Sequence, residues 1–268
     1  MDFLQVYIQA ALAILIMMII LWIISIVIKN VSIVDLFWGF GYVLAAAVYY
    51  YYAEGNEIRK LIIMILTAIW GLRLTVYLSL RNIGKGEDFR YQEFRKNFGA
   101  HRYWWFSFFQ TFLLQGVLMW LVSAPLLAAM HYGKDYQLNF IDYMAIIIWV
   151  IGFIFEAGGD YQLARFKSDA NNNGKVLNTG LWKYTRHPNY FGDSTIWWAF
   201  GLFSIAAGSY LPVLGSVLMT LLLIKVSGVA LLERSLKDKK PEYNEYIRRT
   251  SAFFPWPPKK INNGMDPK

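Results

Sequence analysis

The sequence contains no cysteine and only three histidines among its 268 residues. The lack of cysteine excludes disulfides, thiolate metal ligands and a cysteine nucleophile. His101, His131 and His187 are scattered along the chain, a distribution that does not suggest a zinc centre. Charge is also scarce, because Asp, Glu, Lys and Arg together make up 16% of the residues. We therefore expect neither a metal site nor a disulfide-rich fold.

Hydrophobic residues are abundant instead. They make up 57% of the chain and the mean hydropathy is +0.35, more than a soluble domain of this length needs for its core. They gather in runs of roughly 20 residues, the length of a helix that crosses about 30 Å of hydrocarbon. The first run lacks the basic start and the cleavage site of a signal peptide, so we expect it to be a retained helix. The pattern predicts an all-α polytopic membrane bundle of about seven transmembrane helices, at 4–28, 31–52, 58–80, 108–130, 140–160, 190–208 and 210–231.

The distribution of Lys and Arg predicts the orientation of these helices. With the N-terminus outside, the inward-facing segments carry 21 basic residues and the outward-facing segments carry only Arg59, Lys60 and Lys134. Cytoplasmic loops are enriched in Lys and Arg, so this split favours a cytoplasmic C-terminus and a cytoplasmic functional face in a cell membrane. Topology and attraction to anionic membrane lipids then explain the net charge of +8 without nucleic acid.

The chain has no repeat, no low-complexity linker and no change of composition that would mark a soluble domain. We therefore expect one membrane domain over residues 1–268, with the basic tail, 232–268, packed on the functional face. The tail is amphipathic, and two interpretations are open: it lies on the membrane surface, or it folds over the inward loops as a lid.

Acidic residues in apolar segments are the first candidates for function. Asp35 is expected near the inner end of the second helix, where a carboxylate is costly unless it is paired or functional. A structural ion pair, for which Arg73 is a candidate, and a functional role are both open. Glu156 and Asp160 share one face of the fifth helix, so they either clamp a basic side chain or meet donors on a ligand.

The stretch from Asn178 to Asp193, NTGLWKYTRHPNYFGD, is the most distinctive in the chain. Pro188 suits the first turn of a helix, whose free N–H groups and positive dipole end favour an anion. Arg186 and His187 stand directly before it. This pattern favours a phosphate or carboxylate site; the alternative is an interfacial belt of aromatic residues and cations.

These motifs resemble a known membrane family. Residues 178–193 and the tail resemble the C-terminal region of the steroid 5-alpha-reductases. The chain is similar over nearly its full length to their bacterial branch, DUF1295, including Val34-Asp35, Trp70-Gly-Leu-Arg73, Leu232-Glu233-Arg234 and the segment 243–255. The resemblance implies a seven-helix fold in which NADPH, in a cytoplasm-facing cavity, reduces an activated carbon–carbon double bond of a lipid-like steroid, isoprenoid or enone substrate. A soluble dinucleotide-binding domain is not implied, in keeping with the lack of a G-x-G-x-x-G motif after a strand.

The resemblance also implies which residues bind the cofactor. The matching positions carry polar, charged or aromatic side chains: Asp160, Lys167, Asn178, Tyr184, Arg186, Asn189 and Asp193, with Arg81 and Arg234 as phosphate or ribose contacts. Hydride would pass to the β-carbon of an enone while an acid stabilises the enolate oxygen.

The catalytic positions depart from the steroid enzymes, which use a glutamate on the second helix and a tyrosine on the third. Here Asp35 lies in the comparable region and Trp70 stands where the tyrosine is expected, which puts steroid itself in doubt as the substrate. Tyr77, two helical turns further on, is the candidate replacement. Asp35 and Tyr77 are therefore the candidate catalytic residues.

A related group supplies the alternative function. Isoprenylcysteine carboxyl methyltransferases and phospholipid methyltransferases bind S-adenosylmethionine through an Arg-His-Pro-x-Tyr run and a later Glu-Glu pair. Residues 186–190 match that run, so His187 and Tyr190 join the cofactor candidates. Glu233 stands at the acidic pair but follows Leu232 in place of a second acid, a departure that favours the reductase. A non-enzymatic lipid-binding or scaffold protein is a third class.

Overall fold

The computed structural model describes residues 1–82, 84–133, 137–227 and 242–259. These residues form helices and loops, and apart from one isolated bridge between Thr185 and Ser251 they contain no β-structure. Among them, four helices are long and apolar enough to cross a membrane: Phe3–Ile28, Glu57–Asn82, Tyr103–His131 and Phe140–Ser168. The all-helical membrane architecture expected from composition is confirmed to this extent.

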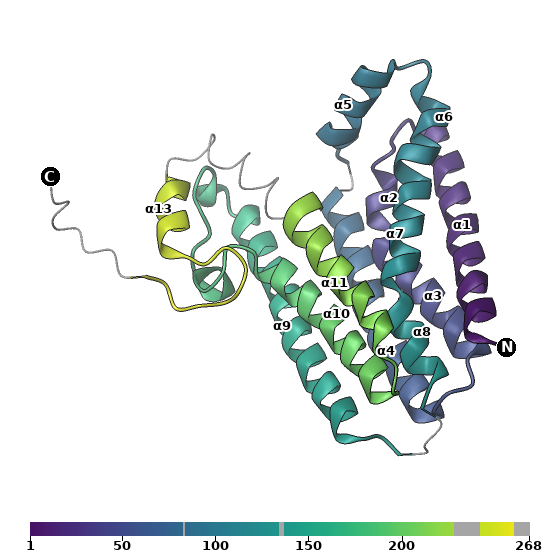
Figure 1. The fold of residues 1–268 in the computed structure, drawn as a ribbon. Helices are drawn as coiled ribbons and strands as arrows, with labels where there is room; N and C mark the ends of the chain where they lie inside the picture. Colours follow the sequence, from purple (N-terminus) through teal and green to yellow (C-terminus); the bar gives the residue numbers. More distant parts are fainter. Residues whose placement is uncertain (83, 134–136, 228–241, 260–268) are drawn as a thin grey trace, which may run out of the picture. The chain divides into compact units, whose positions relative to one another are not determined.

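The chain divides into two compact units, and the first is an N-terminal helical bundle. Unit 1 comprises Met1–Asp142 and Phe200–Gly215. Its helices are α1 (Phe3–Ile28), α2 (Ile33–Leu36), α3 (Trp38–Tyr52), α4 (Glu57–Asn82), α5 (Phe89–Phe98), α6 (Tyr103–Ser107), a π-helix (Phe108–Leu113), α7 (Leu114–Val122), α8 (Ala124–His131) and a 3₁₀ turn (Leu211–Val213) (Figure 1).

Unit 2 comprises Tyr143–Ala199 and Ser216–Lys268. It holds most of α9 (Phe140–Ser168), the larger part of α10 (Pro188–Ala206) and of α11 (Leu214–Leu221), and α13 (Glu242–Arg249). Shorter turns lie at Ala170–Asn172 and Gly180–Lys183, and a π-helix follows α11 at Leu222–Ser227.

Helix α1 is suited to a lipid surround. Asp2 and Gln5 form a capping box that satisfies two of the free N–H groups at its start. Large apolar side chains remain exposed along one face, including Leu4, Ile8, Ile16 and Val27. Exposure of this apolar face to water would be unfavourable, whereas lipid chains cover it without such a cost.

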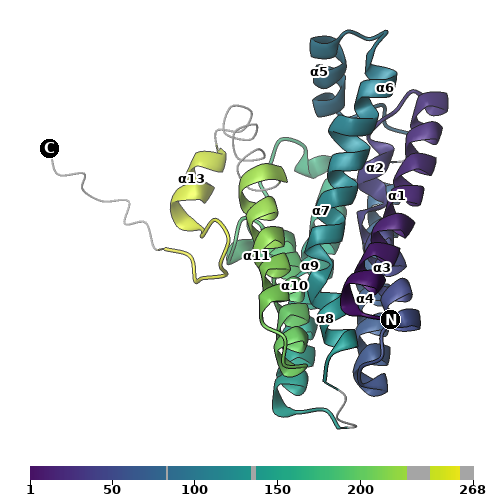
Figure 2. The same cartoon turned by 45° about the vertical axis from the view of Figure 1, so that its right-hand side comes forward.

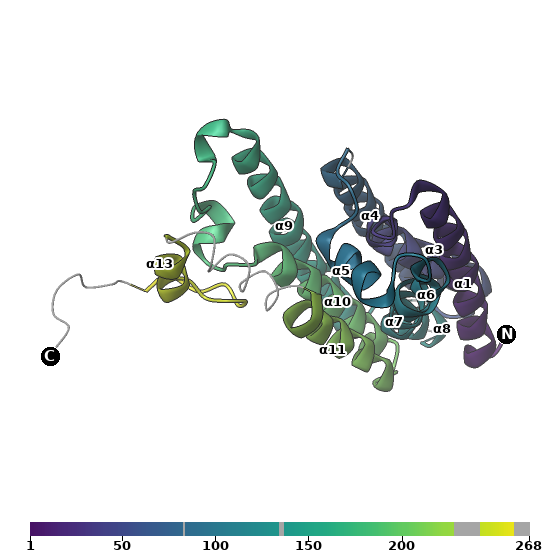
Figure 3. The same ribbon diagram turned by 90° about the horizontal axis from the view of Figure 1, so that it is seen from above.

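The core of unit 1 forms where α3 packs between α1 and α4, as the view from above shows (Figure 3). Gly39 and Gly71 allow α3 and α4 to approach closely, because a Cβ added to Gly39 would lie 2.1 Å from the Gly71 carbonyl oxygen. Trp70 is fully buried beside Tyr42, with ring centroids 5.7 Å apart. Trp70 is thus a packing residue of this core.

The prediction of one continuous second helix over 31–52 is wrong. The structure has a one-turn helix, α2, followed by the 15-residue α3, with Phe37 between them in a non-helical conformation. Asp35 therefore belongs to the short α2 and is not part of the longer helix. The Asp35 side chain bonds to two residues of α5, Arg90 and Tyr91.

Arg59 and Lys60, which the charge pattern counted with the outward-facing segments, are not exposed at the surface. Both lie in the first turn of α4 and are buried. Arg59 makes a two-pronged ion pair with Asp142, Nε to Oδ1 at 2.7 Å and Nη2 to Oδ2 at 2.8 Å. The pair is 2% and 0% exposed, and Asp142 also accepts from the Asn139 main-chain N–H at 2.9 Å. Lys134 lies outside the described residues.

Helices occur at the other predicted positions, with shifted ends. The fourth begins at Tyr103, widens into the π-helix and is interrupted at Ser123, before Pro125, whose missing N–H cannot continue the helical ladder. The fifth extends to Ser168. The sixth begins at Pro188, as its sequence predicts. The seventh is a shorter apolar helix, Leu211–Lys225, and residues 228–231 of that prediction lie outside the described residues.

In unit 2, α9 and α10 pack against each other through glycines. A Cβ on Gly192 would lie 2.3 Å from the Glu156 main-chain nitrogen and 2.5 Å from the Gly152 carbonyl oxygen. A Cβ on Gly159 would lie 3.1 Å from both the Asn189 main-chain nitrogen and Pro188 Cγ, which is tighter than ordinary contact. This close approach places the start of α10 directly against the polar end of α9.

Candidate functional site

The tail residues 242–259 fold onto the connection between α9 and α10. The Arg186 main-chain N–H donates to the Ser251 carbonyl at 2.9 Å, and Thr185 Oγ1 donates to the Phe253 carbonyl at 2.8 Å. The Trp256 main-chain N–H donates to the Tyr184 carbonyl, also at 2.9 Å. Main-chain bonds between segments about 70 residues apart fix the described part of the tail on the 182–187 segment.

Arg186 is buried and closes the C-terminal end of α13. Its Nη1 donates to the Thr250 carbonyl at 2.6 Å and to the Ile247 carbonyl at 3.1 Å. The last carbonyls of a helix have no partner within it, and they carry partial negative charge. Arg186, which the sequence predicts to bind an anion, thus uses at least one of its nitrogens to bond the tail.

Tyr246 joins α13 to the 3₁₀ turn Gly180–Lys183. Its hydroxyl donates to the Trp182 carbonyl, and the Trp182 indole N–H donates to the Gly159 carbonyl at 3.1 Å. Burial raises the pKa of Tyr246, and the neighbouring Tyr243 adds to the rise. The neutral hydroxyl is therefore kept as a donor, and the turn is held from both α13 and α9.

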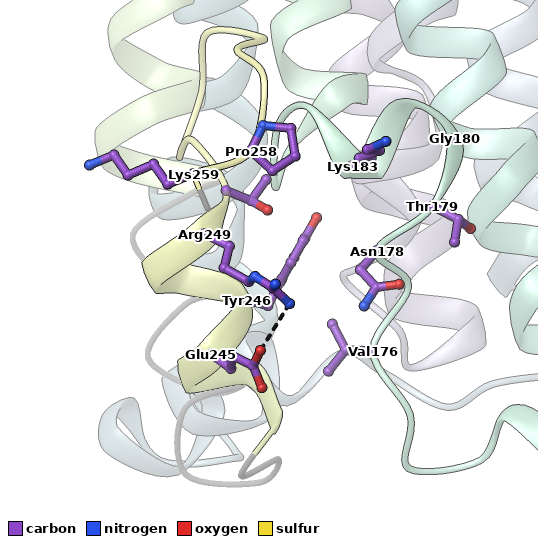
Figure 4. Close-up of a pocket in the computed structure, with 11 residues that line it drawn as sticks. Val176, Asn178, Thr179, Gly180, Lys183, Glu245, Tyr246, Arg249, Pro258 and Lys259 are labelled. Carbon is purple, nitrogen blue, oxygen red and sulfur yellow. Dashed lines mark hydrogen bonds and ion pairs between the residues drawn. The ribbon is translucent and has the colours of Figure 1, made fainter. Parts of the chain in front are cut away.

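A pocket of about 850 Å³ lies where the tail meets the loop before this turn. Its walls come from the 176–183 segment and from α13 with the chain that follows it. Figure 4 shows Asn178 and Thr179 on one side, Glu245 and Arg249 on the other, and Tyr246 extending between them. The lining residues are Val176, Asn178, Thr179, Gly180, Lys183, Glu245, Tyr246, Arg249, Thr250, Pro258 and Lys259.

Positive charge dominates the pocket lining. Lys183 is exposed, lies 5.9 Å from the Tyr184 ring centre and is in none of the ion pairs of the described residues. Arg249 is held by Glu245 at 3.0 Å, which neutralises one of the charges. Lys259 directs its amine away from the space in Figure 4, and its main-chain N–H donates to the Arg249 carbonyl. Lys183 is therefore the cation most available to a ligand.

A second polar group lies between α9 and α10. Asn189 Nδ2 donates to Asp160 Oδ1 at 3.1 Å, and Asp160 is buried. Asn189 Oδ1 is also buried, and no donor among the described residues reaches it. Glu156 and Asp193 are buried in the same part of unit 2. The sequence left open whether Glu156 and Asp160 clamp a basic side chain or meet donors on a ligand. In the structure, Asp160 accepts from the side-chain amide of Asn189.

The other predicted cofactor residues are distributed around these two groups. His187 is buried and stacks on Tyr190, with ring centroids 5.6 Å apart. Tyr184 and Lys167 are exposed. Asn178 is the one predicted residue that lines the pocket. Glu233 and Arg234 lie outside the described residues.

Arg81 and the two candidate catalytic residues belong to unit 1. The Arg81 guanidinium lies 5.6 Å from the Tyr77 ring centre. Asp35 has other neighbours: Arg90 Nη2 donates to Oδ2 at 2.8 Å, and the Tyr91 hydroxyl donates to Oδ1 at 2.7 Å. The partner of Asp35 is thus Arg90, not the expected Arg73.

The Asp35 ion pair is part of a longer hydrogen-bonded chain. The Trp38 indole N–H donates to Gln115 Oε1 at 2.5 Å, and Gln115 Nε2 donates to the Tyr91 hydroxyl at 3.1 Å. Asp35 in turn accepts a hydrogen bond from the Tyr91 hydroxyl, so α2, α3, α5 and α7 are connected through side chains. This arrangement holds α5 against the ends of the longer helices.

Burial, hydrogen bonds and nearby charges shift the pKa values of the polar groups around α5. Burial opposes the ionised form of Asp88, but hydrogen bonds from Arg90 lower the pKa of Asp88 below its usual value. Burial likewise opposes the charge on Arg90, yet its bond to Asp88 and the charge of Asp35 raise the pKa of Arg90. Burial and the Asp35 charge raise the pKa of Tyr91, which keeps its proton for Asp35.

Most residues of the pocket were missed from the sequence. Tyr246, Arg249 and Lys183 come from the tail and from the turn that follows Asn178. One signal was present: Tyr243, Tyr246 and Thr250 recur at three- and four-residue spacing, and all three are buried. That spacing predicts a tail helix with one packed face, although not the surface it packs on.

Comparison with known proteins identifies relatives without a described activity. A family model with the description "Protein of unknown function (DUF1295)" matches residues 21–250. The chain is similar to "Uncharacterized protein C594.04c" of Schizosaccharomyces pombe, with 28% identity over 260 residues, covering 88% of this chain and 76% of that protein. No solved structure matches the chain.

Proposed function

The chain belongs to the DUF1295 family, and we propose that it is a membrane oxidoreductase that uses NADPH to reduce a carbon–carbon double bond of a lipid-like substrate. One observation carries the proposal: the pocket of about 850 Å³ presents Lys183, Arg249 and Asn178 where the tail meets the 176–183 segment. Cations and amide groups around a concave space of this size suit a ligand with several phosphates.

The residues present fit the dinucleotide. Lys183 supplies a charge that no carboxylate of the described residues neutralises, and Arg249 adds a second guanidinium on the facing wall. Asn189 Oδ1 is a buried acceptor that no donor of the described residues reaches, which suits the carboxamide of a nicotinamide or the amine of an adenine. Thr250 and Tyr246 complete a polar wall.

NADPH would supply a hydride to the substrate double bond. The chain's own part is to bind the phosphates, exclude water and donate a proton to the reduced product. The resemblance to the steroid 5-alpha-reductases assigns the substrate carbonyl to Asp35 and Tyr77. The Tyr91 hydroxyl donates a hydrogen bond to Asp35 Oδ1 at 2.7 Å, so this pair is the better-supported proton source in unit 1.

The positive charge of the pocket lining also favours the reductase over the alternative, a methyltransferase. S-adenosylmethionine carries a sulfonium cation and no phosphate, so a pocket with Lys183 and Arg249 gives it less electrostatic support than it gives NADPH. The fold-level resemblance to the methyltransferases rests on residues 186–190, and Arg186 there closes the end of α13.

The proposal includes seven transmembrane helices, with the N-terminus outside and the tail in the cytoplasm. Three shorter elements join the four long helices: α3, the 19-residue α10 and the apolar helix Leu211–Lys225. The 15 residues of α3 reach about 23 Å at 1.5 Å per residue, enough when the bilayer thins locally. Because Arg59 and Lys60 are buried, the segments proposed to face outward have fewer exposed basic residues than the sequence count gave.

A titration of NADPH against the detergent-purified protein tests the function. We expect saturable binding, followed by nicotinamide fluorescence, that weakens about tenfold in Lys183→Gln because one charge-assisted bond to phosphate is lost. Lys96→Gln is the matched control, since Lys96 is exposed, belongs to unit 1 and does not line the pocket. Equal affinity in both variants would place the nucleotide elsewhere, and absence of binding in the unaltered protein would refute the reductase.

A further inference from the structure

A smaller pocket, of about 270 Å³, lies in unit 1 at the C-terminal end of α1. It is separate from the nucleotide pocket, whose residues all belong to unit 2. Figures 1 and 2 show this end of α1 beside α6, the start of the helical segment Tyr103–His131. The lining residues are Ser25, Ile26, Lys29, Val31, Arg95, Ala100, Tyr103, Trp104 and Ser107.

Lys29 occupies an unusual backbone position at the pocket. It ends α1 with φ 53° and ψ 37°, the left-handed region, and among the described residues it is the one non-glycine with positive φ. Glycine is the usual residue at such a helix end because a side chain there is strained. A lysine that is kept in spite of this strain suggests a use for its charge.

The other charges around the pocket are already paired. Arg95 donates to Glu87 through Nη2 at 2.8 Å and Nε at 3.1 Å, and it lies 5.0 Å from the Tyr103 ring centre. Glu87 also accepts from the Val31 main-chain N–H at 2.9 Å. Lys29 appears in none of the ion pairs of the described residues. The pocket therefore has one positive charge in excess.

The pocket lies where a membrane boundary is expected. Two candidate membrane helices meet at it, α1 by its end and Tyr103–His131 by its beginning. Trp104 lines it and is 54% exposed, and Trp105 and Phe109 on the same segment are also exposed. Aromatic side chains of this kind gather at the level of lipid headgroups. Val27, 77% exposed, continues the apolar surface along α1, where an acyl chain would lie.

We propose that this pocket binds the phosphate of an anionic phospholipid, with Lys29 as the cation that pairs with it. The volume is equivalent to about nine water molecules at 30 Å³ each, room for a phosphodiester and its first ester groups. Arg95, fixed by Glu87 and Tyr103, retains Nη1 as a further donor toward the same anion. Trp104 and Val27 supply apolar surface for the chains, which a free phosphate does not use.

Binding of short-chain lipids to the detergent-purified protein, followed by native mass spectrometry, tests the site. We expect dihexanoyl-phosphatidylglycerol to bind more tightly than the phosphatidylcholine of the same chains. In Lys29→Gly the phosphatidylglycerol affinity should fall about tenfold or more, because a charge-assisted bond is lost. This variant relieves the backbone strain, so its thermal midpoint should equal or exceed that of the unaltered protein.

Two controls keep the test specific. Lys29→Arg retains the charge and should retain the preference, whereas Lys96→Ala removes an exposed cation of α5 that does not line the pocket and should change nothing. Equal phosphatidylglycerol binding in Lys29→Gly and the unaltered protein would overturn the proposal. Displacement of the lipid by an equal concentration of inorganic phosphate would also overturn it, in favour of a site for free phosphate.

Discussion

Arg186 Nη1 donates to the main-chain carbonyl of Thr250 at 2.6 Å, across 64 residues of sequence. A side chain that lies two residues before the start of α10 thereby holds the end of α13, and with it one wall of the larger pocket. The residue that the sequence marks most strongly as an anion ligand thus also builds the surface to which the anion would bind.

Replacement of Arg186 should release the tail. In Arg186→Leu the Thr250 and Ile247 carbonyls lose a charged donor, which costs about 1.5–3 kcal/mol for each bond to a charged group. We expect a lower thermal midpoint and rapid tryptic cleavage after Arg248 and Arg249. Arg165→Leu, on the exposed end of α9, should show neither effect. Unchanged proteolysis in Arg186→Leu would mean that the tail is held by its main-chain bonds alone.

Tyr246 should make the protein sensitive to alkali. Its folded-state pKa is raised above the value of about 10 of an unfolded tyrosine, so its contribution to stability is complete below pH 10 and is lost as pH rises further. Tyr246→Phe removes the bond to the Trp182 carbonyl and should lose about 0.5–1.5 kcal/mol at neutral pH. Thermal midpoints between pH 8 and 11 should then fall less steeply in the variant; parallel curves would show that Tyr246 does not titrate with unfolding.

Asp35 should affect turnover and leave nucleotide binding intact. In Asp35→Asn the charge opposite Arg90 is lost, while an amide oxygen still accepts from Tyr91. We expect NADPH to bind as before and NADPH oxidation with an enone lipid to stop. Asp88→Asn, which alters the other carboxylate on Arg90, should retain most activity. A variant Asp35→Asn that fails to fold would instead assign Asp35 to a structural ion pair.

The Arg59–Asp142 pair should be critical for stability. Removal of one partner leaves a buried charge uncompensated, at a cost of about 3–5 kcal/mol. We expect Asp142→Asn and Arg59→Met each to lower the thermal midpoint sharply, and the double variant Arg59→Met/Asp142→Leu to recover much of the loss. A double variant as unstable as the sum of both single changes would show that the two residues do not act together.

The sequence predicted the elements that depend on local signals. Long apolar runs located α1, α4 and α9, and Pro188 marked the first residue of α10. Phe37 gave no such signal, because nothing in its neighbours forbids a helix through it, and the break between α2 and α3 was therefore missed. The Asp35 partner was missed for a related reason, since Arg90 follows 55 residues later in the chain.

Long-range contacts also limited what could be predicted about the candidate site from the sequence. Arg59 was counted among the outward-facing cations and its ion pair was missed, because its partner Asp142 lies 83 residues away and only the fold brings the two together. Asn178, a cofactor candidate from its motif, lines the pocket, whereas Tyr246 and Arg249 enter through the folding of the tail. Composition and motifs identify which side chains are costly or reactive, and tertiary contacts decide which of them meet.

The most direct test of the proposed function is the thermal midpoint of the detergent-purified protein with NADPH, NADH, S-adenosylmethionine or S-adenosylhomocysteine added. A ligand that binds only the folded state raises the midpoint, by about 2.7 kcal/mol of stability at a concentration of 100 Kd. We predict a rise with NADPH, a smaller one with NADH and none with the two methionine-derived compounds. A rise with S-adenosylmethionine and S-adenosylhomocysteine alone would contradict the reductase and assign the protein to methyl transfer.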